Sequence, residues 1–65
     1  MKIRYFRDTD TLYIEFRQAP SVEARDLDEN TQIELDARGN VCSLTLEHAS
    51  QRADLPRIDY EQVAA

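Results

Sequence analysis

Cys42 and His48 are the only cysteine and the only histidine, so they are the one pair able to act as thiol nucleophile and imidazole base. Such a pair works only when the two side chains lie within hydrogen-bond reach. Six residues of extended chain separate two positions by about 20 Å, which excludes direct contact unless a second subunit intervenes. We therefore interpret Cys42 as a small buried apolar residue and His48 as the end of a strand or the start of a helix.

Carboxylates gather in two short runs, Asp8-Thr9-Asp10 and Asp26-Leu27-Asp28-Glu29, whose oxygens are of the type that binds a hard cation such as calcium. Neither run has the glycine and closing glutamate of a calcium loop, and short acidic side chains are common in turns. One cysteine and one histidine leave a zinc site two ligands short. We predict turns here, with no metal and no cofactor.

Glu15, Glu34 and Asp36 alternate with apolar residues and are expected on the same sheet face as Lys2 and Arg4. An acid/base pair for hydrolysis needs a partly dry pocket, whereas opposite charges on an open face are typical of cross-strand ion pairs. We predict ion pairing, no catalytic residues and a protein that is not an enzyme.

Phe6 and Tyr13 are aromatic residues on the nominally polar face, while Tyr5 and Phe16 belong to the apolar face. Aromatic side chains beside arginines can stack on nucleic-acid bases, but exposed aromatic residues are also frequent in protein interfaces. We predict that Phe6 and Tyr13 form part of a protein interface.

The composition supports a small, acidic, single domain: 65 residues with a formal net charge of −5. That charge repels phosphate backbones, so nucleic-acid binding by the chain alone is not expected. A lone cysteine cannot form an internal disulfide, and the charged start of the chain does not resemble a leader peptide, which together favour the cytoplasm. No apolar run approaches the roughly 20 residues of a membrane span.

Alternation of apolar and polar residues, interrupted by turn-forming residues, predicts a β-rich chain. Pro20 predicts a turn, the charged third segment suits an edge strand, and Gly39 suits a left-handed position in a tight turn. A helical turn is expected near residues 49–53, ended by Leu55-Pro56. The fold class is α+β, mainly β: an antiparallel meander of four to five strands with a short C-terminal helix, the strands covering residues 2–6, 11–17, 22–27, 31–36 and 41–47.

Residues 1–55 are expected to form the domain and residues 56–65 a tail. The tail carries Ile58, Tyr60 and Val63, which are too apolar for a fully solvated end. A core this small gains stability from additional contacts, so we expect the tail to dock on the sheet, on a sister subunit or on another protein, and we expect a homodimer.

Several spacings occur in order: Met1-x-Ile3-x-Tyr5, Asp10-x-Leu12-Tyr13-Ile14-x-Phe16, Ile33-x-Leu35-Asp36-x-x-Gly39-x-Val41, Leu44-x-Leu46 and Ala49-Ser50. Together they resemble domain-of-unknown-function family 2283, whose members are small prokaryotic proteins. The resemblance implies fold and compartment and transfers no functional residues. Cys42-Ser43 departs from the usual aliphatic residue followed by glycine.

Members of that family are often encoded beside small proteins that look like ribonuclease toxins. The resemblance therefore implies an antitoxin-like partner role, and an acidic surface suits a small basic partner. The leading hypothesis is a non-enzymatic protein-interaction module. The alternative is a nucleic-acid-binding or regulatory protein whose dimer gathers Lys2, Arg4, Arg7 and Arg17 into a basic patch.

Overall fold

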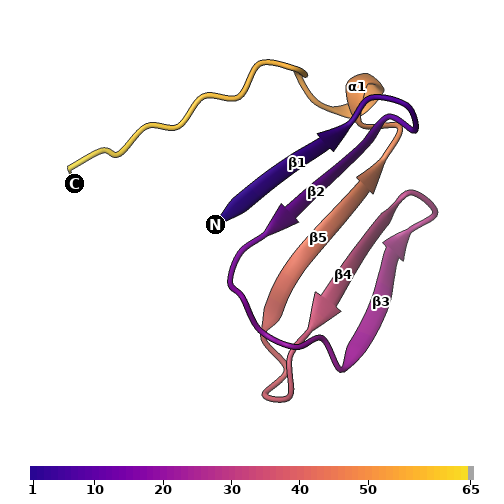
Figure 1. Cartoon of the computed structure of the whole chain (residues 1–65), viewed down its shortest axis with the longest axis vertical. Coiled ribbons are helices and arrows are strands. Elements are labelled where there is room, and N and C mark those ends of the chain that lie inside the picture. The colour runs from indigo at the N-terminus through magenta and orange to yellow at the C-terminus, as the bar shows by residue number, and fades with distance from the viewer. Residues whose placement is uncertain (65) are drawn as a thin grey trace.

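The computed structural model describes residues 1–64 and contains one antiparallel sheet of five strands followed by one helical turn (Figure 1). The fold class predicted from the sequence, α+β with mainly β structure, is confirmed. No helix in the described residues has the length and apolar character needed to cross a bilayer. The elements are β1 Lys2–Phe6, β2 Thr11–Glu15, β3 Glu23–Asp28, β4 Thr31–Leu35, β5 Val41–Glu47 and α1 Ala49–Arg52.

The strand order is β1-β2-β5-β4-β3, which differs from a meander at one point. β5 lies between β2 and β4, and residues 16–22 carry the chain from β2 to the far edge of the sheet (Figure 1). Burial explains the order. β5 contains Cys42 and Ser43, each only 2% exposed, whereas every residue of β3 is exposed. A strand with four charged side chains among six residues suits an edge, as expected from the sequence.

The turn between β4 and β5 has the conformation that its sequence predicts. Gly39 has a φ of 82°, and its N–H donates to the Asp36 carbonyl at 3.0 Å. One carboxylate oxygen of Asp36 accepts hydrogen bonds from the backbone N–H groups of Arg38 and Asn40, both at 2.9 Å. Asp36 and Gly39 therefore fix the tight connection that aligns β4 with β5.

Strand register sorts the side chains into two faces. Ile3, Ile14, Leu44 and Ile33 are directly opposed across β1, β2, β5 and β4, and a parallel row contains Tyr5, Leu12, Leu46 and Thr31. We call these two rows the aliphatic face. The residues between them in sequence point to the opposite side of the pleat, which we call the polar face. Its rows contain Lys2, Glu15, Ser43 and Glu34, then Arg4, Tyr13, Thr45 and Gln32, then Phe6, Thr11 and Glu47.

The sheet forms a single layer, and the whole chain, with its tail, has extents of 35 × 32 × 17 Å. α1 lies at one end of the sheet beside the β1–β2 turn, and the following segment runs outward past β1 (Figure 1). Among residues 1–64 the buried apolar residues are Leu12, Leu35, Cys42 and Ala49. β2 ends at Glu15, two residues earlier than expected, and Phe16 is 42% exposed, so the sequence placed it too deeply in the core.

Candidate functional site

The polar face has a shallow hollow over β1, β2 and β5 that contains both aromatic residues predicted for an interface. We call it the aromatic hollow; it is lined by Arg4, Phe6, Thr11, Tyr13, Glu15 and Thr45. Arg4 opposes Tyr13 across the strands, and Phe6 opposes Thr11. Phe6 is 48% exposed and Tyr13 is half-buried. The structure therefore brings Phe6 and Tyr13 together beside one cationic and one anionic side chain.

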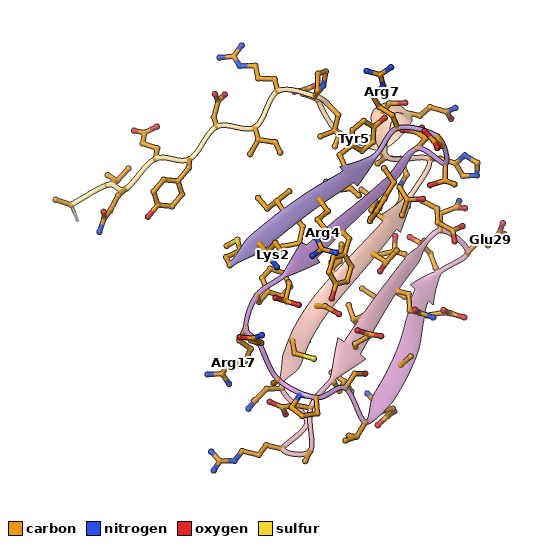
Figure 2. All side chains as sticks on the ribbon, in the orientation of Figure 1. Lys2, Arg4, Tyr5, Arg7, Arg17 and Glu29 are labelled. Carbon is orange, nitrogen blue, oxygen red and sulfur yellow. The ribbon has the colours of Figure 1, made fainter. Side chains whose placement is uncertain are left out.

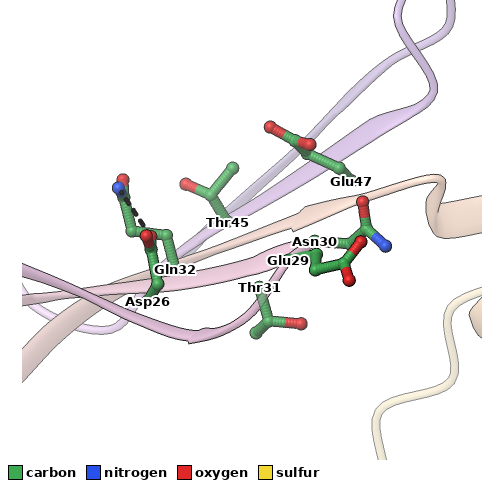
Figure 3. Close-up of a pocket in the computed structure, with 7 residues that line it drawn as sticks. All are labelled: Asp26, Glu29, Asn30, Thr31, Gln32, Thr45 and Glu47. Carbon is green, nitrogen blue, oxygen red and sulfur yellow. Dashed lines mark hydrogen bonds between the residues drawn. The ribbon is translucent and has the colours of Figure 1, made fainter.

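A second hollow lies on the other side of Thr45, toward β4 and β3 (Figure 3). We call it the acidic hollow; it is lined by Asp26, Glu29, Asn30, Thr31, Gln32, Thr45 and Glu47. The Gln32 amide donates to Asp26 at 3.3 Å, and no lining residue is basic. Within residues 1–64, no three side chains of metal-binding type gather closely enough to hold an ion. The hollow is thus a negatively charged surface.

Asp10 joins three parts of the chain at the end of the sheet where α1 begins. Its carboxylate accepts hydrogen bonds from the Tyr5 hydroxyl at 2.5 Å, the Ser50 hydroxyl at 2.8 Å and the Ser50 N–H at 3.0 Å. Its backbone carbonyl accepts from Ala49 N–H at 2.9 Å. Because both N–H groups belong to the first turn of α1, Asp10 caps a helix that lies 40 residues away.

These hydrogen bonds also set the protonation states of the cluster. The Tyr5 hydroxyl first and the Ser50 hydroxyl second hold the pKa of Asp10 below its ordinary value of 3.8, while the bond to Asp10 raises the pKa of Tyr5 above 10.0. At neutral pH Asp10 is therefore a carboxylate and Tyr5 a neutral phenol. Ser50 donates a hydrogen bond to a carboxylate whose pKa is lowered, so Asp10 is a weaker base than an ordinary aspartate.

The Cys42 thiol and the His48 imidazole lie at opposite ends of β5. Cys42 is buried in β5 and donates to the Glu34 carbonyl at 3.4 Å, while His48 follows the other end of β5 as the N-cap residue of α1. His48 has a φ of 55° and makes no side-chain capping bond. Both positions agree with the interpretation made from the sequence.

The predicted cross-strand ion pairs are wrong. Within residues 1–64 the ion pairs join Arg25 to Glu23, Arg52 to Asp28 and Arg57 to Asp59, all at exposed positions. Lys2 opposes Glu15 in register but makes no ion pair with it. Glu34 instead accepts from the Ser43 hydroxyl at 2.7 Å, and Asp36 is used by its turn. Glu34 is therefore bound by a hydroxyl of the neighbouring strand and Asp36 by backbone N–H groups of its own turn, and neither is paired with a cation among the described residues.

The four basic residues of the alternative hypothesis do not form one patch in a single chain. Figure 2 shows Lys2 and Arg4 on β1, Arg7 at one end of the β1–β2 hairpin and Arg17 beyond its other end. The predicted tail residues also lie apart from the aromatic hollow. Ile58, Tyr60 and Val63 are 52%, 85% and 70% exposed, and docking of the tail remains a prediction.

Sequence reasoning missed the contact between Asp10 and Ser50. The sequence predicts that Asp10 is a turn residue, and its φ of 54° agrees with that, but its side chain also reaches α1. The sequence carries a signal of this contact, because Tyr5, Asp10 and Ala49-Ser50 all belong to the ordered spacings that resemble the family. Separation by 40 residues hides such a contact from any local pattern.

A single antiparallel sheet whose terminal helical turn is capped by a distant aspartate defines a small α+β protein with two open faces. The chain belongs to the family described as Protein of unknown function (DUF2283), whose model matches residues 2–50. The match includes Tyr5, Asp10 and Ser50, so the Asp10 cluster lies wholly inside the family region. Searches of curated proteins and of solved structures each gave no significant match.

Proposed function

We propose that this chain is a non-enzymatic protein-interaction module whose polar face binds a small basic protein, in the manner of an antitoxin. The observation that carries the proposal is the aromatic hollow, where Phe6 and Tyr13 lie beside Glu15 on an uncovered face. Aromatic faces and a carboxylate together attract a cationic side chain through cation–π and charge-assisted contacts.

The charge distribution supports a basic partner. The acidic hollow adds Asp26, Glu29 and Glu47 directly across Thr45, which lines both hollows. An extended basic segment that crosses β5 would contact the aromatic residues first and the carboxylates next. A net charge of −5 also accelerates encounter with a positively charged protein. The single thiol is buried and unpaired, which suits a reducing compartment such as the cytoplasm.

The test is capture from a lysate of the source cell by the tagged full-length chain, followed by mass spectrometry. We expect one small basic protein at fixed stoichiometry, released as salt is raised. Phe6→Ser should lower its retention at least about tenfold, because interface aromatics carry much of the binding energy. Val22→Ser, at an exposed apolar position outside the hollow, is the matched control and should retain it. Absence of any basic protein at low salt would contradict the proposal.

Nucleic-acid binding is the second candidate, since Lys2 and Arg4 share the polar face with Phe6 and Tyr13. Aromatic residues beside cations are typical of single-strand binders. A mobility-shift assay of the purified chain with single-stranded RNA separates the candidates. Salt-sensitive binding lost in Arg4→Ser would favour nucleic acid, and no shift at low salt would remove this candidate.

A further inference from the structure

On the aliphatic face, Leu12 and Thr31 of one row are buried, but the row that begins at Ile3 has no second layer of protein on it. Domains are normally built from at least two packed layers, because one side of a sheet is apolar. Here Ile3, Ile14, Leu44 and Ile33 form an unbroken row across four strands, yet Ile3 is 40% exposed and the other three are only half-buried. α1 is a single turn at the end of the sheet and does not cover this row (Figure 1).

The dimensions of the chain indicate how much surface is left uncovered. Its accessible surface is 5400 Å², whereas a compact monomer of 7.6 kDa exposes about 4,300 Å². Its radius of gyration is 12.9 Å, against about 11 Å for a compact domain of this length. The extended tail and the open sheet together contribute this excess of about 1,100 Å².

The distribution of charged side chains indicates that a second copy of the chain would cover the aliphatic face and not the polar face. The row on the aliphatic face reaches its first charged side chain at Arg25 on β3, and Arg25 is already paired with Glu23 at 2.6 Å. Two copies can thus approach on this side without bringing like charges together at the centre. The polar face carries Lys2, Arg4, Glu15 and Glu34, whose burial against a second copy would strip charged groups of water.

We propose that a second copy of this chain packs its aliphatic face against the first about a two-fold axis, giving a two-layer sandwich of sheets. An apolar face is self-complementary, and a two-fold axis brings the same face of both copies together, as a closed dimer requires. Sheets packed in this way lie about 10 Å apart. The polar faces then point outward on both sides, so this dimer leaves each one free whether or not it binds a partner.

The first test is the mass of the purified full-length chain and of two variants of β1, measured by sedimentation and light scattering. We expect a dimer of the 7.6 kDa chain. Ile3→Glu should raise the dimer dissociation constant at least about 100-fold, because both copies would bury an unpaired carboxylate. Phe6→Glu is the matched control: Phe6 lies on the same strand with similar exposure, 48% against 40%, but on the opposite face, so it should remain dimeric.

The second test needs no substitution that could impair folding. In a sample mixed from isotope-labelled and unlabelled chains, intermolecular contacts should appear between methyl groups of Ile14, Leu44 and Ile33 of the two copies. A dimer without these contacts would overturn the proposal.

Other occupants of the aliphatic face give different results. A wild-type chain that stays monomeric at hundreds of micromolar would overturn the proposal and leave its own tail or a foreign protein as the cover. A full-length variant with Ile58, Tyr60 and Val63 changed to serine tests the tail. If that variant is monomeric while Ile3→Glu is dimeric, the tail and not the sheet face joins the copies. Loss of the dimer in Phe6→Glu alone would also contradict the proposal.

Discussion

One carboxylate, Asp10, holds the end of the sheet to the helical turn that follows it. It binds Tyr5 of β1 and both the N–H and hydroxyl of Ser50 in α1. A helix of four residues cannot persist alone, because helix nucleation is unfavourable and short helices depend on tertiary contacts. The stability of the helical turn thus depends on one side chain, that of Asp10.

Acid should therefore destabilise the protein partly through Asp10. Its pKa is lowered from 3.8 by the bonds from Tyr5 and Ser50, so the folded state binds fewer protons than the unfolded chain in acid. Its stabilising effect is complete above about pH 4 and is lost as the pH falls through the folded-state pKa. Urea unfolding at a series of acidic pH values should show a shallower loss for Asp10→Asn than for the wild type. Equal slopes would contradict this assignment.

Asp28 and Asp36 explain why the variant should retain some pH dependence. The N–H of Asn30 is the main cause of the lowered pKa of Asp28, and the N–H of Asn40 is the main cause for Asp36. Both carboxylates are protonated as the pH falls, as Asp10 is, and their contribution to stability is then lost.

Gly39→Ala should destabilise the fold by about 1 kcal/mol, since a φ of 82° places an L-residue in the left-handed region. An added Cβ would meet no atom within 4 Å, so the cost arises from the backbone alone. For a domain of this size the midpoint temperature should fall by about 4–8 °C. Gly39→Asn is the control and should lose less, because Asn tolerates this conformation. A larger loss for Asn would indicate a side-chain cause.

At the scale of elements, the sheet has a protected centre and two unlike edges. β5 has partners on both sides, β2 and β4, whereas β3 has one partner, carries four charged side chains among six residues and contains a register shift between Asp26 and Asp28. Charges and bulges on an edge strand oppose pairing with further chains. We therefore expect copies of this chain to associate through a face of the sheet and not through the β3 edge.

Hydrogen exchange should follow this arrangement. Backbone amides of β5 should exchange most slowly, those of β3 that point outward should exchange quickly, and residues 56–64 should show almost no protection. Amide exchange followed by NMR measures each of these directly. Protection in the tail comparable to that in β5 would show that the tail is docked in solution.

At the scale of the whole molecule, stability should depend on association. Large apolar side chains that are at least 40% exposed outnumber the buried apolar residues among residues 1–64, which is unusual for a stable monomer. A second copy removes part of this surface from water, and burial of apolar surface is the main favourable contribution to folding.

The midpoint temperature should therefore rise with protein concentration. For a dimer that dissociates as it unfolds, each tenfold increase in concentration adds about 1.4 kcal/mol to its stability. Differential scanning calorimetry over two decades of concentration should show a rise for the wild type and for Phe6→Glu. Ile3→Glu should show none. A wild-type midpoint independent of concentration would contradict coupled folding and association.

The sequence by itself determined the local features of this protein. Alternation placed all five strands within about two residues of their observed ends, Gly39 and Asp36 specified one turn, and the charges of β3 marked it as an edge. These properties depend on neighbouring residues, so they can be read along the chain. Tertiary structure alone decided that β5 lies between β2 and β4, that Asp10 caps α1, and that Phe6 and Tyr13 share a hollow with Thr45. Each of these joins segments far apart in sequence, where burial and available hydrogen-bond donors, and not local preference, select the partner.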